Sequence, residues 1–199
     1  RFTLDGWVEP EAGSPVCHLS YYEADALARF LDARLPTEQE WEICATPLPK
    51  DQGNFVESGE LRPVPLPRKK RGPKEALEFD QMFGDVWEWT ASAYAPYPGF
   101  QAPSGAVGEY NGKFMVNQMV LRGGSCWSPR GHLRASYRNF WHPDTQFQMS
   151  GARLARSPGK KRKLPMAKAI WQGVVLAEGD RFEIVEGNVY FPREALRRR

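Results

Sequence analysis

The chain has 199 residues, which is enough for one globular domain with a hydrophobic core and a small appendage. Hydrophobic residues make up 41% and charged residues 26%, as in ordinary soluble domains, and 18 glycines, 17 prolines and 7 tryptophans favour a loop-rich, aromatic core over a helical bundle or a repeat. No apolar run approaches the roughly 20 residues of a membrane span, and the N-terminus does not resemble a signal peptide.

Two helices are predicted near the N-terminus, each preceded by a capping box. Ser20 and Glu23 form the first box, and Thr37 and Glu40 form the second. Trp41 is expected on the buried side of the second helix. In the first helix, four apolar residues share one face and are expected to be buried: Ala24, Leu27, Phe30 and Leu31.

The middle of the chain is expected to combine long loops with short strands. Residues 46–78 are rich in proline and charge and predict a long surface excursion, and residues 93–113 predict a second loop. Between them, alternation predicts a strand at residues 86–90, with Trp87 and Trp89 in the core. Further strands are expected at Met119–Arg122, Leu133–Asn139 and Gly151–Ala155.

The composition changes after residue 156. Residues 157–199 hold 10 basic and 5 acidic side chains, although the net charge of the whole chain is only +3. We interpret residues 157–165 as a basic linker and residues 166–199 as a partial β-rich module, because a single small sheet is not stable alone. The predicted organisation is a main domain over residues 1–156, which is expected to be N-terminally incomplete, and a short C-terminal β appendage.

Cysteine and histidine usage points to no metal site. The three cysteines, Cys17, Cys44 and Cys126, are far apart and odd in number, which argues against a disulfide framework or a zinc site. They favour a reducing, cytoplasmic location, and each is expected to be a small buried side chain. The three histidines lack the spacing of an iron site. His18 is expected to pack before the first helix, and no residue is predicted to bind a metal.

Five motifs occur in the same order as in the formylglycine-generating-enzyme/sulfatase-modifying-factor superfamily, which the chain resembles. They are Pro15–His18, Arg34–Glu42, Gly84–Trp89, Leu121–Ser125 and Gly151–Ala155. This resemblance implies an α+β fold of the formylglycine-generating-enzyme, C-type-lectin-like kind, with little regular structure.

Within that superfamily the chain is most similar to EgtB-type sulfoxide synthases of ergothioneine biosynthesis. The matching segments are Gly108–Gln118, Val120–Cys126, Tyr137–Phe140 and Gly151–Leu154. The resemblance implies an oxidoreductase that joins hercynine, the trimethylammonium betaine of histidine, to a thiol (cysteine or γ-glutamylcysteine) with O2 and Fe(II). It also implies that the iron ligands come from an N-terminal helical domain outside this sequence.

By the same resemblance, the substrate pocket would include Gln118, Arg138, Asn139, Phe140 and Trp141. Asn139 would bind the hercynine carboxylate, while Phe140 and Trp141 would line the pocket, since aromatic faces hold quaternary ammonium groups. Gln118 stands where some family members carry a proton-donating tyrosine, and an amide cannot take that role. Trp141 replaces a carboxylate that some members use toward the sulfur substrate, so the thiol stays open, and the catalytic residues stay unknown.

Two other interpretations stay open. A copper-dependent formylglycine-generating oxidase would use two close cysteines just after the Gly-Gly-Ser turn, whereas Cys126 stands alone there. A non-catalytic ligand-binding scaffold of the same fold is the stronger alternative, because no iron-ligand spacing occurs. A preference for hercynine over histidine separates the enzyme half from the scaffold. Alone, the chain is expected to bind hercynine weakly or not at all and to be catalytically inactive.

Overall fold

The computed structural model describes residues 2–3, 6–9, 11–66, 79–157, 167–171, 174–179, 183–185 and 188–190. The chain divides into two compact units, residues 1–155 and residues 156–199. The linker expected at residues 157–165 lies outside the described residues, apart from residue 157, and so do residues 67–78 of the excursion expected at residues 46–78.

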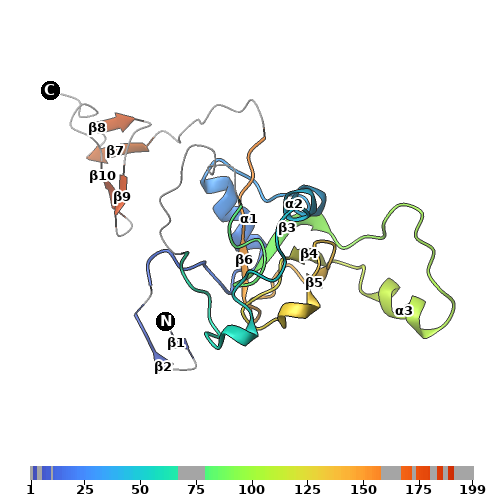
Figure 1. Ribbon diagram of the computed structural model, residues 1–199. Helices are drawn as coiled ribbons and strands as arrows, with labels where there is room; N and C mark the ends of the chain where they lie inside the picture. The colour runs from blue at the N-terminus through green and yellow to red at the C-terminus, as the bar shows by residue number, and fades with distance from the viewer. Residues whose placement is uncertain are drawn as a thin grey trace. The chain divides into compact units, whose positions relative to one another are not determined.

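A four-stranded sheet lies within the first unit, in the order β5-β4-β3-β6 (Figure 1). β3 (Trp87–Ala93) pairs antiparallel with β4 (Met119–Arg122) and parallel with β6 (Ser150–Ala152). β4 pairs antiparallel with β5 (Asn139–Trp141). β5 is therefore an edge strand of this sheet.

Two helices lie against the sheet. α1 (Tyr21–Phe30) contacts β3, and α2 (Glu38–Ala45) contacts β3 and β4. Each begins with the capping box that the sequence predicts. In the first box, Ser20 Oγ accepts the backbone N–H of Glu23 at 3.2 Å, and the Glu23 carboxylate accepts the backbone N–H of Ser20 at 2.8 Å. Both predicted helix starts are confirmed.

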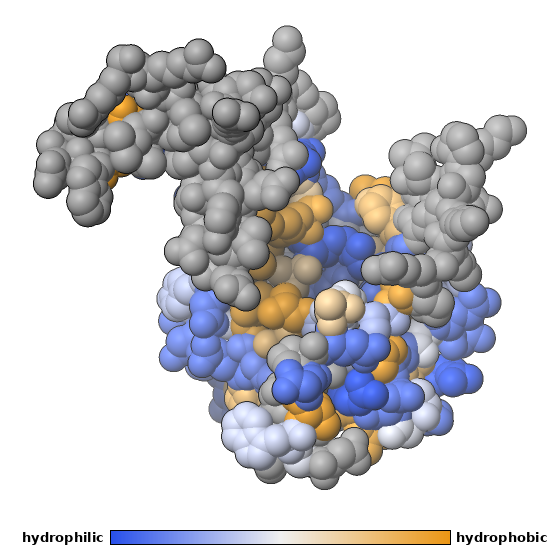
Figure 2. Space-filling model, turned by 90° about the vertical axis from the view of Figure 1, so that its left-hand side faces the viewer, coloured by the Kyte–Doolittle hydropathy of each residue, from blue (hydrophilic) through white to orange (hydrophobic). Residues whose placement is uncertain are grey.

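The buried face of α1 differs from the prediction. Ala24 and Ala28 are fully buried, whereas the larger apolar side chains on the helix are exposed by 37% to 61%: Leu27, Phe30 and Leu31. Two alanines let the helix backbone approach the sheet closely, and the larger side chains then remain outside. Figure 2 shows that apolar residues form separate patches among hydrophilic residues on one face of the molecule.

The core is aromatic, as predicted. Trp87 and Trp89 are 8% and 0% exposed, and the indole N–H of Trp89 donates to the carbonyl of Leu19 at 2.7 Å. Trp41 is also buried and packs edge-to-face against Phe83, with ring centroids 5.7 Å apart. Such contacts add to the free energy gained from burying the rings.

The three cysteines are free thiols. Cys126 is fully buried, whereas Cys17 and Cys44 are only half-buried, so the prediction of burial is right for one of the three. Burial raises the pKa of the Cys126 thiol to about 12. A thiol that stays protonated at neutral pH is a poor nucleophile, which fits a packing role for Cys126.

Three loop and strand assignments need correction. The expected loop at residues 93–113 contains the helix α3 (Ala106–Lys113), which Figure 1 shows on a long excursion between β3 and β4. The strand expected at residues 133–139 begins only at Asn139, because a 3-10 turn (Arg130–His132) and a further turn precede it. The last strand of the four-stranded sheet, β6, begins one residue earlier than expected and ends at Ala152. A second 3-10 turn, η1, spans Val56–Ser58.

Short antiparallel hairpins complete the described elements. Near the N-terminus, β1 (Phe2–Thr3) pairs with β2 (Gly6–Trp7). In the second unit, β7 pairs with β8, and β9 pairs with β10; their bounds are Ala167–Trp171, Val174–Gly179, Glu183–Val185 and Asn188–Tyr190. Among the helices that the structure describes, none has the length and apolar character needed to cross a membrane.

An exposed ion pair predicts how stability responds to acid. Arg34 donates to both carboxylate oxygens of Glu40, each at 2.7 Å, and these bonds hold the pKa of Glu40 at about 2, below its ordinary value of 4.5. A lowered pKa in the folded state stabilises the fold above pH 4.5, and this contribution is lost as the pH falls toward 2. Because the Glu40 side chain is 47% exposed, we expect the contribution to stay below about 1 kcal/mol.

Urea unfolding of the Arg34→Gln variant at pH 6 and pH 3 checks this expectation. The variant should lose stability at pH 6, and the difference from the parent should shrink at pH 3. Arg29→Gln, which removes the exposed pair with Asp25, is the matched control and should show a smaller change at both pH values. A loss for Arg34→Gln that is equal at the two pH values would contradict the assignment.

Candidate functional site

The edge strand β5 and the start of β4 bring the predicted site residues together. The register pairs Val120 with Phe140 and Met119 with Trp141, and one further step places Gln118 opposite His142. Because side chains alternate along a strand, Phe140 and Trp141 point to opposite faces of the sheet. We call Gln118, Asn139, Phe140, Trp141 and His142 the β5 edge site, since all five residues lie on the edge strand, next to it, or at the start of the neighbouring strand.

On one face, Phe140 belongs to an aromatic cluster. Its ring stacks almost parallel on Tyr94, with centroids 3.9 Å apart and 8° between the planes, and Phe114 lies 6.0 Å away. The backbone N–H of Tyr94 donates to the carbonyl of Gln118 at 2.8 Å. This backbone bond holds Tyr94 opposite Gln118.

Arg138 is held by the protein itself. It donates to the two carboxylate oxygens of Glu38 at 2.8 and 2.9 Å and to the carbonyl of Ala95 at 3.0 Å. Its guanidinium also lies 4.7 and 4.4 Å from the ring centres of Tyr94 and Tyr97. All three guanidinium nitrogens therefore have a protein partner. The guanidinium group packs against the rings of Tyr94 and Tyr97 and so helps to hold the aromatic cluster in place.

Glu38 joins Arg138 to a second, fully buried arginine. Arg122 has no exposed side-chain surface; it donates to Glu38 at 3.0 Å and to Glu42 at 2.9 Å. It also donates to the carbonyl of Ala135 at 2.6 Å. The Glu38 side chain is 5% exposed and forms ion pairs with both Arg122 and Arg138. The first residue of α2 thus links the end of β4 to the residue before β5.

On the opposite face, Asn139 and Trp141 have other neighbours. Asn139 donates from its amide to the side-chain carbonyl of Gln148 at 3.2 Å, and its own side-chain oxygen accepts the backbone N–H of Phe140. The Trp141 ring packs edge-to-face on Phe147, with centroids 4.7 Å apart. The indole N–H of Trp141 is buried and has no hydrogen-bond partner among the described residues.

His142 is a site residue that the sequence analysis did not identify. Its ring nitrogen Nδ1 lies 3.2 Å from the carbonyl of Asn117, and Nε2 lies 3.5 Å from the amide nitrogen of Gln118. The only sequence signal was its position two residues after Phe140, which puts both side chains on one face of an extended strand.

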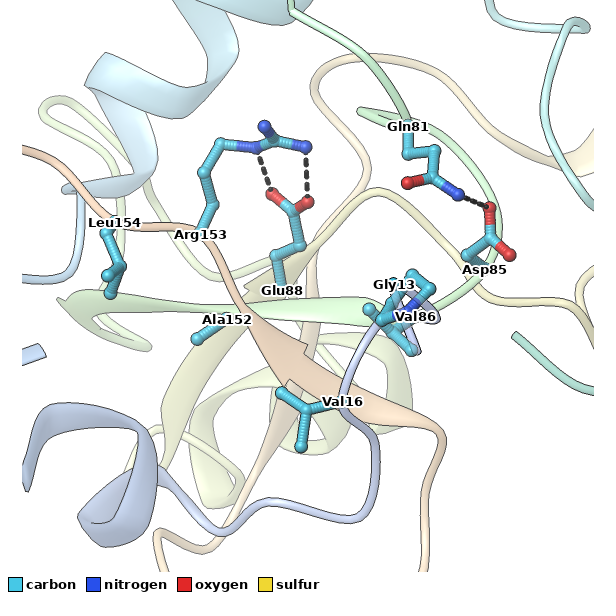
Figure 3. Close-up of a pocket in the computed structure, with 10 residues that line it drawn as sticks. Gly13, Val16, Gln81, Asp85, Val86, Glu88, Ala152, Arg153 and Leu154 are labelled. Atoms are coloured by element: carbon cyan, nitrogen blue, oxygen red, sulfur yellow. Dashed lines mark hydrogen bonds and ion pairs between the residues drawn. The ribbon is translucent and has the colours of Figure 1, made fainter. Parts of the chain in front are cut away.

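Figure 3 shows a separate cavity of about 390 Å³ in the first unit. Arg153 and Glu88 face each other in it, with two hydrogen bonds of 2.8 and 3.0 Å, and Gln81 donates to Asp85 at 3.0 Å. Burial raises the pKa of Glu88, while the neighbouring Arg153 lowers it. Because these charged groups bond to one another, we interpret the cavity wall as a support of the core.

The described residues offer no ligand set for a metal ion. No group of three or more histidine, cysteine, aspartate or glutamate side chains that could hold a metal occurs in the described part of the chain. His18, which was expected to pack before α1, is instead exposed. It has a positive φ of 63°, and its ring lies 3.1 Å from the carbonyl of Gln146, so the backbone turn directs it outward.

The curated relatives of this chain include hercynine oxygenases. The chain is 40% identical over 160 residues to a hercynine oxygenase of Mycobacterium tuberculosis, covering 72% of this chain and 37% of that protein. A hercynine oxygenase of Mycolicibacterium smegmatis is 37% identical over 172 residues, covering 77% and 40%. The chain thus spans about two fifths of the length of these curated relatives.

The fold is shared more widely. PvdO from Pseudomonas aeruginosa matches with a TM-score of 0.54 at 19% identity, covering 74% of this chain and 63% of that chain. This agreement and the elements described above confirm the loop-rich α+β fold of the first unit. The sulfatase-modifying factor enzyme 1-like domain matches residues 6–66 and 52–158. The chain therefore belongs to the sulfatase-modifying factor enzyme 1-like domain family and is a relative of the hercynine oxygenases.

Proposed function

We propose that residues 1–156 form the substrate-binding half of a non-haem iron sulfoxide synthase. Such an enzyme replaces the ring C–H of the hercynine imidazole and the S–H of a thiol by a C–S bond and oxidises that sulfur to the sulfoxide. O2 is the four-electron oxidant, with one oxygen atom ending in the sulfoxide and the other in water. The observation that carries the proposal is the β5 edge site, which groups aromatic faces and amides in a relative of hercynine oxygenases.

The chemistry of hercynine matches that of the β5 edge site. A trimethylammonium group is held by aromatic faces, and Trp141 and Phe147 supply them on the face of the strand that also carries Asn139. Phe140, on the opposite face beside Gln118, would line the part of the pocket that takes the imidazole ring. The carboxylate needs N–H donors, and Asn139 has one amide hydrogen beyond its bond to Gln148. In this proposal Arg138 contributes by holding the aromatic cluster, because Glu38 and Ala95 already take its hydrogen bonds.

Iron does not fit the described residues of this chain, since they contain no suitable ligand set. We therefore assign no iron-dependent step of the reaction to these residues. The proposal places the iron ligands in an N-terminal helical domain, as the resemblance to EgtB-type enzymes implies. The chain's own part is to bind and orient hercynine at the sheet edge.

Oxygen consumption tests whether this chain binds hercynine while a separate N-terminal domain binds iron. With Fe(II), hercynine and either cysteine or γ-glutamylcysteine, the purified chain should show no hercynine-dependent O2 uptake. The same chain joined behind the helical domain of an EgtB-type enzyme should form the sulfoxide. In that fusion, Asn139→Ala should raise the KM for hercynine about ten-fold, which corresponds to one lost hydrogen bond to a charged group.

Gln101→Ala, which changes an amide in an exposed loop, is the control and should leave the KM unchanged. Uptake by the chain alone, or an unchanged KM in Asn139→Ala, would overturn the proposal. The alternative is a binding scaffold of the same fold without catalytic function. It is favoured by the lack of a metal-ligand set among the described residues, and it predicts no product from the fusion.

A further inference from the structure

The contacts of His142 determine which of its ring nitrogens carries the hydrogen. Nδ1 lies 3.2 Å from the carbonyl of Asn117, and a carbonyl oxygen can only accept a hydrogen bond. Nδ1 must therefore carry the hydrogen for this contact to be favourable. In the neutral ring, Nε2 then has the free lone pair and acts as the acceptor.

That tautomer in turn orients the amide of Gln118. Nε2 of His142 faces the Gln118 side chain at 3.5 Å, and an acceptor there requires the NH2 end of the amide. Gln118 is only 8% exposed, so the choice of hydrogen-bond partners for its side chain is restricted. The carbonyl of Asn117, the ring of His142 and the amide of Gln118 thus form one directed chain of hydrogen bonds, which leaves the Gln118 side-chain carbonyl outside it.

We propose that His142 is a positioning residue that presents the side-chain carbonyl of Gln118 as a hydrogen-bond acceptor for a ring N–H of the substrate. This inference rests on the proposed function, because it concerns the same β5 edge site. The imidazole of hercynine has such an N–H, and Gln118 lies beside the Tyr94–Phe140 stack through its backbone bond to Tyr94. Gln118 would therefore recognise the ring, while Asn139 and the aromatic faces recognise the betaine end.

The tautomer can be measured without a ligand. In ¹⁵N NMR spectra of the full chain, protonated and bare imidazole nitrogens resonate far apart. We expect His142 to show a protonated Nδ1 and a bare Nε2 near neutral pH, and we expect the Gln118 side-chain NH2 signals to shift in His142→Phe. A protonated Nε2 with a bare Nδ1 would overturn the inference, whatever the substrate is.

Ligand titrations then test the role of Gln118. Phenylalanine betaine is the matched probe, because it keeps the trimethylammonium and carboxylate groups and lacks a ring N–H. His142→Phe should weaken hercynine binding about three- to ten-fold, as expected for one neutral hydrogen bond, and leave phenylalanine betaine unaffected. His142→Gln keeps an acceptor toward Gln118 and should retain most of the hercynine affinity.

The outcomes separate the two proposals. Equal weakening of both betaines in His142→Phe would show a merely structural role for His142 and overturn the inference. If neither betaine binds to the chain or to its fusion with an EgtB-type helical domain, the proposed function fails. The inference then fails with it, since Gln118 would have no substrate N–H from which to accept a hydrogen bond. If hercynine binds and the tautomer is the opposite one, only the inference fails.

Discussion

Replacing Glu38 by glutamine is expected to lower the free energy of unfolding by about 3 kcal/mol. The Glu38 side chain is 5% exposed and lies between Arg122, which is completely buried, and Arg138, which is 12% exposed. A neutral amide leaves the buried positive charges undercompensated, and removal of one partner from a buried ion pair costs much more than removal of an exposed one. Urea unfolding near neutral pH measures the change.

The matched control is Glu60→Gln. Glu60 lies 3.3 Å from Arg62, and its side chain is 46% exposed, so its removal should change the free energy of unfolding by less than about 1 kcal/mol. Similar losses in the two variants would contradict the assignment of Glu38 as the central carboxylate of a buried network. Phe140 and Tyr94 should also become less ordered in Glu38→Gln, because Arg138 loses its ion-pair partner.

Replacing Trp89 by alanine is expected to cost about 4 kcal/mol of stability. The side chain has no exposed surface, packs edge-to-face on Tyr21 with centroids 6.0 Å apart, and donates to the carbonyl of Leu19. The substitution removes a large buried volume and leaves the Leu19 carbonyl with one partner fewer. If the alanine variant fails to fold, Trp89→Phe keeps most of the apolar contact and should lose roughly half as much.

Trp127→Ala is the control for Trp89. Trp127 also donates its indole N–H to a carbonyl, that of Leu61 at 2.9 Å, but its side chain is 50% exposed. We expect a loss of about 1 kcal/mol for this variant, since little buried volume is removed. Equal losses at the two tryptophans, measured by urea unfolding, would show that the core is centred elsewhere.

Local sequence signals predicted the local structure well. The capping boxes at Ser20 and Thr37 specify helix starts within four residues, and both helices begin there. The alternating aromatic run identified β3, and the tryptophans of that strand are buried. The order of motifs along the chain identified the family, which the domain match and the hercynine oxygenase relatives confirm.

Features set by distant contacts were not predicted. Glu38 is the first residue of the second predicted helix, and its partners Arg122 and Arg138 lie 84 and 100 residues further along the chain. Nothing in the local sequence therefore identifies Glu38 as the centre of a buried network. Phe30 satisfies the helical spacing of a buried face and is 61% exposed, because two alanines make the contact with the sheet. The role proposed for His142 depends on strand register, which sequence spacing alone does not define.

Discrimination between hercynine and histidine tests the central claim most directly. The two ligands differ only in the three methyl groups on the amine, which are the part that aromatic faces would hold. We propose titrating the ¹⁵N-labelled chain, joined behind the helical domain of an EgtB-type enzyme, with millimolar amounts of each ligand, a range in which weak binding is still detected. Shifts from hercynine that are larger than those from histidine and that map to Gln118, Asn139 and Phe140 are the predicted result. Equal shifts, or shifts confined to other parts of the chain, would contradict a hercynine site at the β5 edge and favour the scaffold interpretation.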